Sequence, residues 1–351
     1  MGQKHSVRLQ PVGIDIEVDE DESVLHGAFR QGIMLMHGCK EGQCSACKSF
    51  LLDGEIDMDS YSTFALPDFE KDEGWVLLCR THAYSDIEVE LFNYDEEILR
   101  SGIPIQTRDG VVESVEKLTH DIVKLAVRID QPLPYRAGQY VDLSPGGQDF
   151  HRSFSMANPP TEDGLTLEFM IKMYPGGRFS GLLDSGELGP GDAIGVEGPY
   201  GLFTLRTSSD RPLLFLGGGA GMSAIAALLA SMAKDGSTRP AAFYYGARTE
   251  ADLFHREELE ALTQALPDFR FVPALSESDP ATAWLGETGF VTDVCDRLEE
   301  DLSEVDVYVC GPPPMVDAAI ALLERRGVPE DRIHFDKFTI TAEAEGEGSR
   351  T

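Results

Sequence analysis

The chain has 351 residues, enough for two or three domains, and its hydrophobic content of 42% is ordinary for a globular protein. Its net charge of −32 argues against nucleic acid as a partner, because the nucleic-acid backbone would repel it. Six cysteines are too few for a disulfide scaffold, so we expect a reduced, cytoplasmic setting. No basic start precedes an apolar run, so we expect no signal peptide. The uncharged stretch 212–233 is interrupted by glycines, and we expect it to be buried core rather than a membrane span.

Residues 1–98 predict one small α+β domain. SVRL and IDIEV alternate apolar and polar residues around PVG, which predicts a hairpin. SVLHGAFRQG has helical spacing and opens with Ser23 as an N-cap. VLLC and IEVEL supply further strands, and a linker at 99–106 follows.

Three cysteines in this domain read C-x4-C-x2-C, and a fourth follows at a distance. The pattern is typical of the plant-type ferredoxin loop, in which four thiolates hold a [2Fe–2S] cluster. Its members are Cys39, Cys44, Cys47 and Cys79. Small residues between them, such as Gly38 and Gly42, allow the loop to aim backbone N–H groups at the sulfurs. Structural zinc, which prefers two C-x2–4-C pairs, and disulfides are the alternatives.

The pattern changes twice after the linker. Short strands with turn signals fill 107–208 and predict a β-barrel, with one helix starting near Arg178. From 209 to 338, apolar runs without alternation are separated by segments of helical spacing, which predicts a doubly wound parallel sheet. The tail, 339–351, has almost nothing to bury and is predicted to be disordered.

Six short motifs follow one another through these two regions. They are RSFS at 152–155, GGRFS at 176–180, GPYGLF at 198–203, GGGAGMS at 217–223, CGPPPM at 310–315 and FDKF at 335–338. Their order and spacing resemble the ferredoxin–NADP⁺ reductase superfamily. With the cysteine domain in front, the chain resembles the reductase components of bacterial multicomponent monooxygenases of the soluble methane and propane type. The resemblance implies a β-grasp-like [2Fe–2S] ferredoxin domain, an FAD-binding antiparallel barrel and an NAD-binding α/β domain.

The resemblance also implies where FAD binds. Arg152 would neutralise the pyrophosphate, Phe154 would stack on the isoalloxazine, and Ser155 would lie near the hydride-accepting N5. Many relatives have tyrosine in place of Phe154, so the phenol hydroxyl is missing here. The FAD residues implied in this way are Arg152, Ser153, Phe154, Ser155, Met170, Ile171, Lys172, Gly177, Arg178, Phe179 and Ser180.

GGGAGMS lies between a predicted strand and helix, as a dinucleotide phosphate loop requires, with Ser223 where the family often has proline. The Cys310–Gly311 pair would lie by the nicotinamide, and Phe338, or less favourably Phe335, would shield the flavin. The implied NAD residues are Gly217, Gly218, Gly219, Gly221, Met222, Glu250, Asp252, Cys310, Gly311 and Pro312, and the implied catalytic residues are Ser155, Cys310 and Phe338. The loop ARTEADLF has two acidic side chains against one arginine, which favours NADH over NADPH.

The resemblance implies electron flow from NADH to FAD to [2Fe–2S] to a di-iron hydroxylase. Residues 1–98 carry 21 Asp and Glu against 7 Lys and Arg, a net charge of −14. This charge suits steering toward a basic protein surface, and equally suits solubility or a salt-adapted proteome. With the resemblance, we expect this domain to dock on the hydroxylase. No di-iron or haem motif is present, and we expect a monomer that binds neither nucleic acid nor membrane. A reductase for a Rieske ring-hydroxylating dioxygenase is the alternative partner assignment. A non-catalytic zinc protein is a distant one, because it leaves the flavin motifs unexplained.

Overall fold

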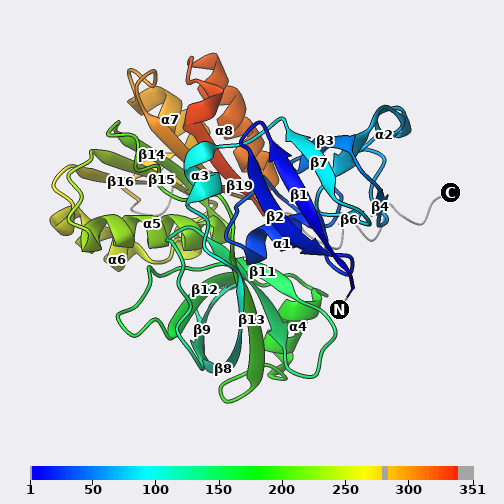
Figure 1. Ribbon diagram of the computed structural model, residues 1–351. Helices are drawn as coiled ribbons and strands as arrows, with labels where there is room; N and C mark the ends of the chain where they lie inside the picture. The colour runs from blue at the N-terminus through cyan, green and yellow to red at the C-terminus, as the bar shows by residue number, and fades with distance from the viewer. Residues whose placement is uncertain (1, 279–283, 339–351) are drawn as a thin grey trace. The chain divides into compact units, whose positions relative to one another are not determined.

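The computed structural model describes residues 2–278 and 284–338, and the chain divides into two compact units (Figure 1). One unit runs to Gln106 and includes Gly198–Leu202, and the other contains Thr107–Glu197 and the chain from Phe203 onward. The predicted disordered tail lies outside the described residues. Within the part of the chain that is described, no helix is long and apolar enough to cross a membrane.

The first unit is built on a mixed five-stranded sheet of order β2-β1-β7-β3-β5, beside a small β4-β6 pair. Its strands are β1 (Lys4–Gln10), β2 (Ile14–Asp19), β3 (Lys48–Asp53), β4 (Ile56–Met58), β5 (Trp75–Leu77), β6 (Thr81–Ala83) and β7 (Ile87–Leu91). Its helices are α1 (Val24–Arg30), α2 (Asp68–Glu73) and α3 (Glu96–Arg100). The predicted hairpin is confirmed, because β1 and β2 pair antiparallel.

Helix α1 begins as the sequence predicted. The Ser23 hydroxyl accepts a hydrogen bond from the His26 backbone N–H at 3.2 Å, which satisfies one otherwise unpaired donor of the first turn. The helix buries Val24, Leu25 and Phe29. The chain between α1 and β3 is left as an irregular loop, and this loop carries three of the four clustered cysteines.

The second unit opens with a six-stranded antiparallel barrel of order β11-β10-β13-β8-β9-β12. Its elements are β8 (Gln106–Lys117), β9 (Ile122–Ile129), β10 (Tyr140–Pro145), β11 (Arg152–Ser155), β12 (Thr166–Lys172), α4 (Arg178–Ser185) and β13 (Ala193–Tyr200). A bridge between Met156 and Phe169 brings the two end strands together and nearly closes the barrel. The helix predicted near Arg178 is confirmed as α4.

The same unit continues as a parallel sheet of order β17-β16-β15-β14-β18-β19, as the buried apolar runs predicted. Its strands are β14 (Leu213–Gly218), β15 (Ala241–Ala247), β16 (Phe269–Leu275), β17 (Glu287–Thr288), β18 (Asp306–Gly311) and β19 (Ile333–Lys337). Its helices are α5 (Met222–Lys234), α6 (Arg256–Ala265), α7 (Val291–Leu298) and α8 (Pro313–Arg325), with short 3-10 turns η1 (Gly219–Gly221), η2 (Glu250–Asp252) and η3 (Glu330–Arg332). The uncharged stretch 212–233 is therefore buried core, since it forms β14 and most of α5.

Two apolar clusters hold helices to both faces of this sheet. Phe215, Phe243 and Tyr245 pack with α5 and α6 on one face. Leu214 and Tyr244, their neighbours in the same strands, pack with α7 and α8 on the other face. Figure 1 shows the two helix pairs on opposite sides of the sheet. Because all six strands run parallel, the loops after β14, β15 and β18 meet at one edge, where such folds bind ligands.

Candidate functional site

The four clustered cysteines form two pairs. A thiol hydrogen bond links Cys39 to Cys44, and another links Cys47 to Cys79. None of them forms a disulfide. Among the described residues, no three of these sulfurs lie within 4.8 Å of one another. One tetrahedral zinc would hold all four sulfurs about 3.8 Å apart, given Zn–S bonds of about 2.3 Å. The paired arrangement therefore fits the two irons of a [2Fe–2S] cluster better than one zinc ion.

Backbone N–H groups point at these sulfurs, as the small residues of the loop predicted. The N–H of Gln43 lies 3.2 Å from the Cys39 sulfur, and that of Glu41 lies 3.4 Å from it. The pKa of Cys39 is lowered to about 5, chiefly by the hydrogen bond from Cys44 and further by these N–H groups. Gly42 adopts a φ of +70°, and a Cβ there would lie 2.8 Å from the Cβ of Tyr61, so the loop requires glycine at this position. The loop thus stabilises the Cys39 thiolate in particular.

The predicted pyrophosphate site gathers two arginines around one aromatic ring. The Arg152 guanidinium lies 5.2 Å from the centre of the Phe150 ring, and that of Arg178 lies 4.1 Å from it. Arg178 is the first residue of α4, and Gly177 is its N-cap. A Cβ on Gly177 would lie 2.5 Å from the Ser180 hydroxyl, so glycine is required for this close turn. Two cations, one of them in the first turn of a helix, suit a diphosphate.

Ser180 has a structural task in that turn. Its hydroxyl donates to the Tyr174 carbonyl at 2.9 Å and accepts from the Tyr174 N–H at 3.3 Å, and the residue is buried. Nearby, the half-buried Phe154 ring lies 4.7 Å from the ring of Phe179. Ser155 follows at the end of β11 and is buried. The FAD roles assigned to these residues remain predictions.

Strand β12 carries the residues predicted to hold the flavin ring, and two of them have partners within the protein. The N–H of Met170 donates to the Ser223 hydroxyl at 3.1 Å, and that hydroxyl donates to the Met170 carbonyl at 3.1 Å. Ser223 thus binds the backbone of Met170, a residue that the resemblance assigned to FAD. Lys172 forms an ion pair with Asp121, while Ile171 is buried in the barrel core.

Close packing requires most of the glycines at the end of β14 and in η1. A Cβ on Gly217, Gly218 or Gly221 would lie under 3.0 Å from another atom. The closest approach is at Gly221, where a Cβ would lie 2.1 Å from the Cys310 carbonyl oxygen. Gly219 differs, because nothing lies within 4 Å of its Cβ position and its φ is +54°. Gly219 therefore faces open space, whereas Met222, the first residue of α5, is fully buried.

The ends of β18 and β19 bring three further residues together. Cys310 is fully buried, and burial raises its pKa, with Asp336 adding to the effect. Asp336 is the register partner of Cys310, and burial raises its pKa to about 6. The Phe338 N–H donates to the Gly311 carbonyl at 3.2 Å, which holds the predicted flavin shield beside the Cys310–Gly311 pair. Phe335 lies farther back, in register with Val309.

Asp336 was missed by the sequence reasoning. FDKF was singled out for its two phenylalanines, and the acid between them received no role. Successive side chains of a strand point to opposite faces, so Asp336 and Phe335 lie on opposite faces of β19. This alternation, in a strand that pairs with β18, was the signal that could have placed Asp336 near Cys310.

The two acids predicted to face the NADH ribose differ in their engagement. Asp252 closes a capping box on η2, accepting from the Thr249 N–H at 3.0 Å and from its hydroxyl at 2.9 Å. Glu250 is more exposed and contacts Arg256 at 3.7 Å. Glu250 is therefore the more available carboxylate.

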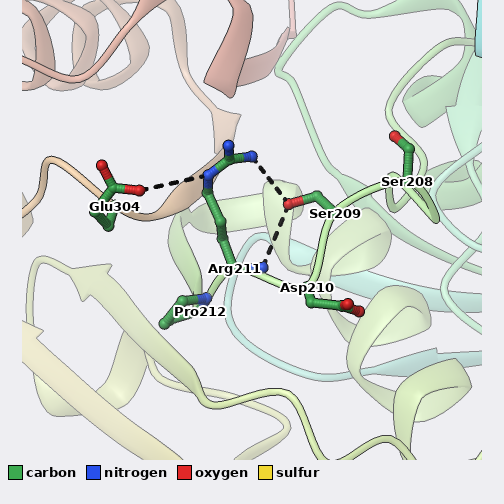
Figure 2. A pocket seen from close by; sticks show the side chains of 6 residues that line it. All are labelled: Ser208, Ser209, Asp210, Arg211, Pro212 and Glu304. Atoms are coloured by element: carbon green, nitrogen blue, oxygen red, sulfur yellow. Dashed lines mark hydrogen bonds and ion pairs between the residues drawn. The ribbon is translucent and has the colours of Figure 1, made fainter.

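Two cavities open at the opposite edge of the parallel sheet, where its strands begin. One has a volume of about 430 Å³ and is lined by Ser208, Ser209, Asp210, Arg211, Pro212 and Glu304. In it Arg211 contacts Ser209 at 3.3 Å and Glu304 at 3.7 Å (Figure 2). The other, of about 270 Å³, lies beside it and shares Pro212. Neither is lined by a predicted cofactor residue, and the predicted NAD residues lie instead at the edge where the strands end.

Comparison with known proteins assigns each region. Family models match as a 2Fe-2S iron-sulfur cluster binding domain over residues 7–84, an oxidoreductase FAD-binding domain over 109–205 and an oxidoreductase NAD-binding domain over 215–320. The chain is 52% identical to the reductase component of propane 2-monooxygenase from Rhodococcus jostii (strain RHA1), over 97% of this chain and 93% of that protein. This chain belongs to the family of monooxygenase reductase components.

Two further likenesses agree. The chain is 36% identical to the reductase component DmpP of phenol 2-monooxygenase from Pseudomonas sp. (strain CF600), over 99% of this chain and 98% of that protein. It is 29% identical to the Amycolatopsis cytochrome P450 reductase GcoB, whose crystal structure covers 96% of this chain and 99% of its own with a TM-score of 0.86. As a monooxygenase reductase component, the chain is a flavin and iron–sulfur oxidoreductase that takes electrons from a nicotinamide cofactor. The predicted fold, cofactors and enzyme class are confirmed.

Proposed function

We propose that this reductase component uses NADH and delivers electrons to the di-iron hydroxylase of a propane-type hydrocarbon monooxygenase. The observation that supports the partner most strongly is the 52% identity to a propane 2-monooxygenase reductase along nearly the whole chain. NADH is supported by the exposed Glu250 in the loop after β15, where an acid suits a free ribose 2′-hydroxyl. Six free cysteines support work in the reducing cytoplasm.

The chain's own residues divide the task between binding and positioning. When bound, FAD accepts two electrons as a hydride and releases them singly, which matches a two-electron donor to a one-electron cluster. Arg152 and Arg178 would hold its diphosphate, and Phe154 would pack on its ring. Cys310 and Gly311 would shape the place of the nicotinamide, and Phe338 would cover the flavin face in the absence of the nicotinamide.

The test of this route is an anaerobic titration of the purified protein with NADH, followed by visible absorption and low-temperature EPR. We expect the flavin and cluster bands to bleach together, with a rhombic reduced [2Fe–2S] signal. A response to NADPH but not to NADH would overturn the choice of cofactor. Propane oxidation should then appear when the purified hydroxylase of a propane monooxygenase is added. A response only with a Rieske dioxygenase would overturn the choice of partner.

We also propose the surface that docks on the hydroxylase. Phe64 is 91% exposed and precedes the polar helix α2, and Phe69, 64% exposed, lies between Asp68 and Glu70 in that helix. This segment is tied to the cysteine loop, because the Ser45 hydroxyl donates to the Ala65 carbonyl at 3.1 Å. Exposed aromatic rings in an acidic field suit a basic protein surface with an apolar centre.

Substitution of Phe64 separates docking from internal electron transfer. We expect Phe64→Ala to slow product formation by the hydroxylase at least tenfold while NADH-driven reduction of ferricyanide stays unchanged. Phe92→Ala is the matched control, because Phe92 is also exposed, at 57%, but follows β7. The wild-type rate with the hydroxylase should fall as salt is added. Equal effects of the two substitutions would rule out this surface.

A further inference from the structure

A cluster of charged side chains joins the flavin barrel to the NAD-binding sheet within the second unit. From the barrel come His120 and Asp121, in the turn between β8 and β9, and Lys172 at the end of β12. From the NAD-binding sheet come Arg248 and Asp252, in the loop after β15. Two carboxylates thus face two permanent cations. The two acids therefore need no metal ion to neutralise them, although their ligand atoms and that of His120 lie close enough together to hold one.

Arg248 is the centre of this cluster. Its Nη2 atom lies 3.3 Å from the Asp252 carboxylate, 3.7 Å from the Asp121 carboxylate and 3.4 Å from the His120 Nε2 atom. Each of these groups lies on the barrel side or in the cap of η2. Asp121 therefore attracts the guanidinium toward the barrel, while Asp252 holds it within its own loop.

Both acids are themselves fixed in place. Asp252 is held by the capping box with Thr249. Asp121 accepts from the Thr119 hydroxyl at 3.1 Å and pairs with Lys172. Burial alone would raise the pKa of Asp121, yet its bond to Lys172 lowers it, so this carboxyl is ionised at neutral pH. Each acid is thus held by contacts other than its contact with Arg248, whose long side chain reaches both of them.

The position of Arg248 in the fold bears on the choice between NADH and NADPH. It follows the second strand of the dinucleotide-binding sheet, where an arginine accommodates the 2′-phosphate of NADPH and an acid binds the free 2′-hydroxyl of NADH. Arg248 is the sole basic residue in the ARTEADLF loop. A cation that already contacts two carboxylates gains less from a phosphate, because it must give up those contacts.

We propose that Asp121, a residue of the flavin barrel, is a specificity determinant that selects against NADPH by holding Arg248 away from the 2′-phosphate. Asp252 supports it from within the loop. The inference rests on the proposed use of NADH, and it adds a residue outside the NAD-binding domain to the features that set this preference. Asp121 acts through Arg248 and is a positioning residue.

The experiment compares NADH and NADPH as donors to ferricyanide, using the full-length protein with its cofactors and rates expressed per bound flavin. We expect Asp121→Asn to raise the ratio of kcat/KM for NADPH over that for NADH about fivefold, the factor that one exposed ion pair can supply. The double variant with Arg248→Ala should return the ratio to the wild-type value. Asp163→Asn is the matched control, since Asp163 also pairs with a barrel arginine, Arg128 at 3.4 Å.

Arg248→Ala alone gives a test that does not depend on the folding of an Asp121 variant. If Arg248 is held away, this change alters NADPH efficiency less than twofold. A severalfold loss would show that Arg248 already binds the 2′-phosphate, and the proposal would be overturned. It would also be overturned if Asp121→Asn left the ratio within twofold, or if the gain survived in the double variant. A wild-type preference for NADPH would instead overturn the proposed use of NADH, while the change in ratio would still decide the role of Asp121.

Inhibition by adenosine 2′,5′-bisphosphate against NADH supplies a binding readout without hydride transfer. We expect its inhibition constant to fall about fivefold in Asp121→Asn and to be unchanged in the double variant. The inhibition constant of 5′-AMP, which lacks the 2′-phosphate, should stay constant in all variants. Equal shifts for both nucleotides would indicate a general change in the site and would contradict a role specific to the 2′-phosphate.

Discussion

Replacement of Ser223 by alanine tests the contact between helix α5 and barrel strand β12. The Ser223 side chain is 2% exposed and makes two hydrogen bonds of 3.1 Å to the backbone of Met170. Each contributes about 1 kcal/mol, and the Met170 groups left without a partner are buried. We therefore expect Ser223→Ala to lower the free energy of unfolding by about 2 kcal/mol. For a unit of this length, that loss lowers Tm by about 4–8 °C.

The assay is thermal unfolding of the cofactor-loaded protein, followed by the rise of FAD fluorescence as the flavin is released. Ser231→Ala is the matched control on the same helix, because the Ser231 hydroxyl bonds locally to Asp235 at 3.2 Å. We expect this control to shift Tm by about 1 °C or less, as surface changes usually do. If the two variants unfold at the same temperature, the Ser223–Met170 contact does not stabilise the unit.

Three further changes test other parts of the site. Gly221→Ala places a Cβ 2.1 Å from the Cys310 carbonyl oxygen, so NADH should no longer reduce the flavin, and Tm should fall. The control is Gly181→Ala, whose Cβ would have no other atom within 4 Å and which should leave Tm equal or higher. Asp336→Asn removes a carboxyl whose pKa is raised by burial from 3.8 to about 6, so ionisation destabilises the wild type as pH rises through this window. The Tm of the variant minus that of the wild type should therefore increase between pH 4 and about pH 6 and then level off. If this difference in Tm does not change with pH, the raised pKa of Asp336 is contradicted. Cys79→Ala should abolish the [2Fe–2S] EPR signal but retain NADH–ferricyanide activity, whereas loss of that activity with FAD still bound would contradict separate cofactor sites.

Local patterns predicted most elements because each depends on neighbours in the sequence. Alternation located the β1–β2 hairpin, and the Ser23 cap located the start of α1. Helix α2 was missed, since it buries no residue and therefore has no apolar stripe. Its remaining signals were Pro67 as N-cap and Gly74 as C-cap, which adopts a φ of +106°.

The residues of the candidate site also divide into those that local sequence patterns predicted and those that they did not. Cysteine spacing and glycine motifs were readable because a cluster and a phosphate loop each need fixed residues at fixed spacing. The partners of Ser223 and Arg248 were not readable, since Met170 and Asp121 lie far away in the sequence. Asp252 illustrates the limit within a motif. Its acidity was noted, but only the folded η2 turn shows that its carboxylate closes a capping box.

The two long-range contacts act on one short piece of the barrel. Ser223 bonds to Met170, and the Asp121–Arg248 cluster includes Lys172, two positions along the same strand. The NAD-binding elements involved are the helix after the glycine loop and the loop after β15, which together cover the dinucleotide edge. Hydride transfer requires the reacting atoms to approach within about 3–3.5 Å. Ser223 contacts β12 directly, and Arg248 is linked to it through Asp121. These polar contacts therefore position the barrel relative to the nicotinamide site, and the contact through Asp121 gives the barrel a means to influence which nicotinamide cofactor is accepted.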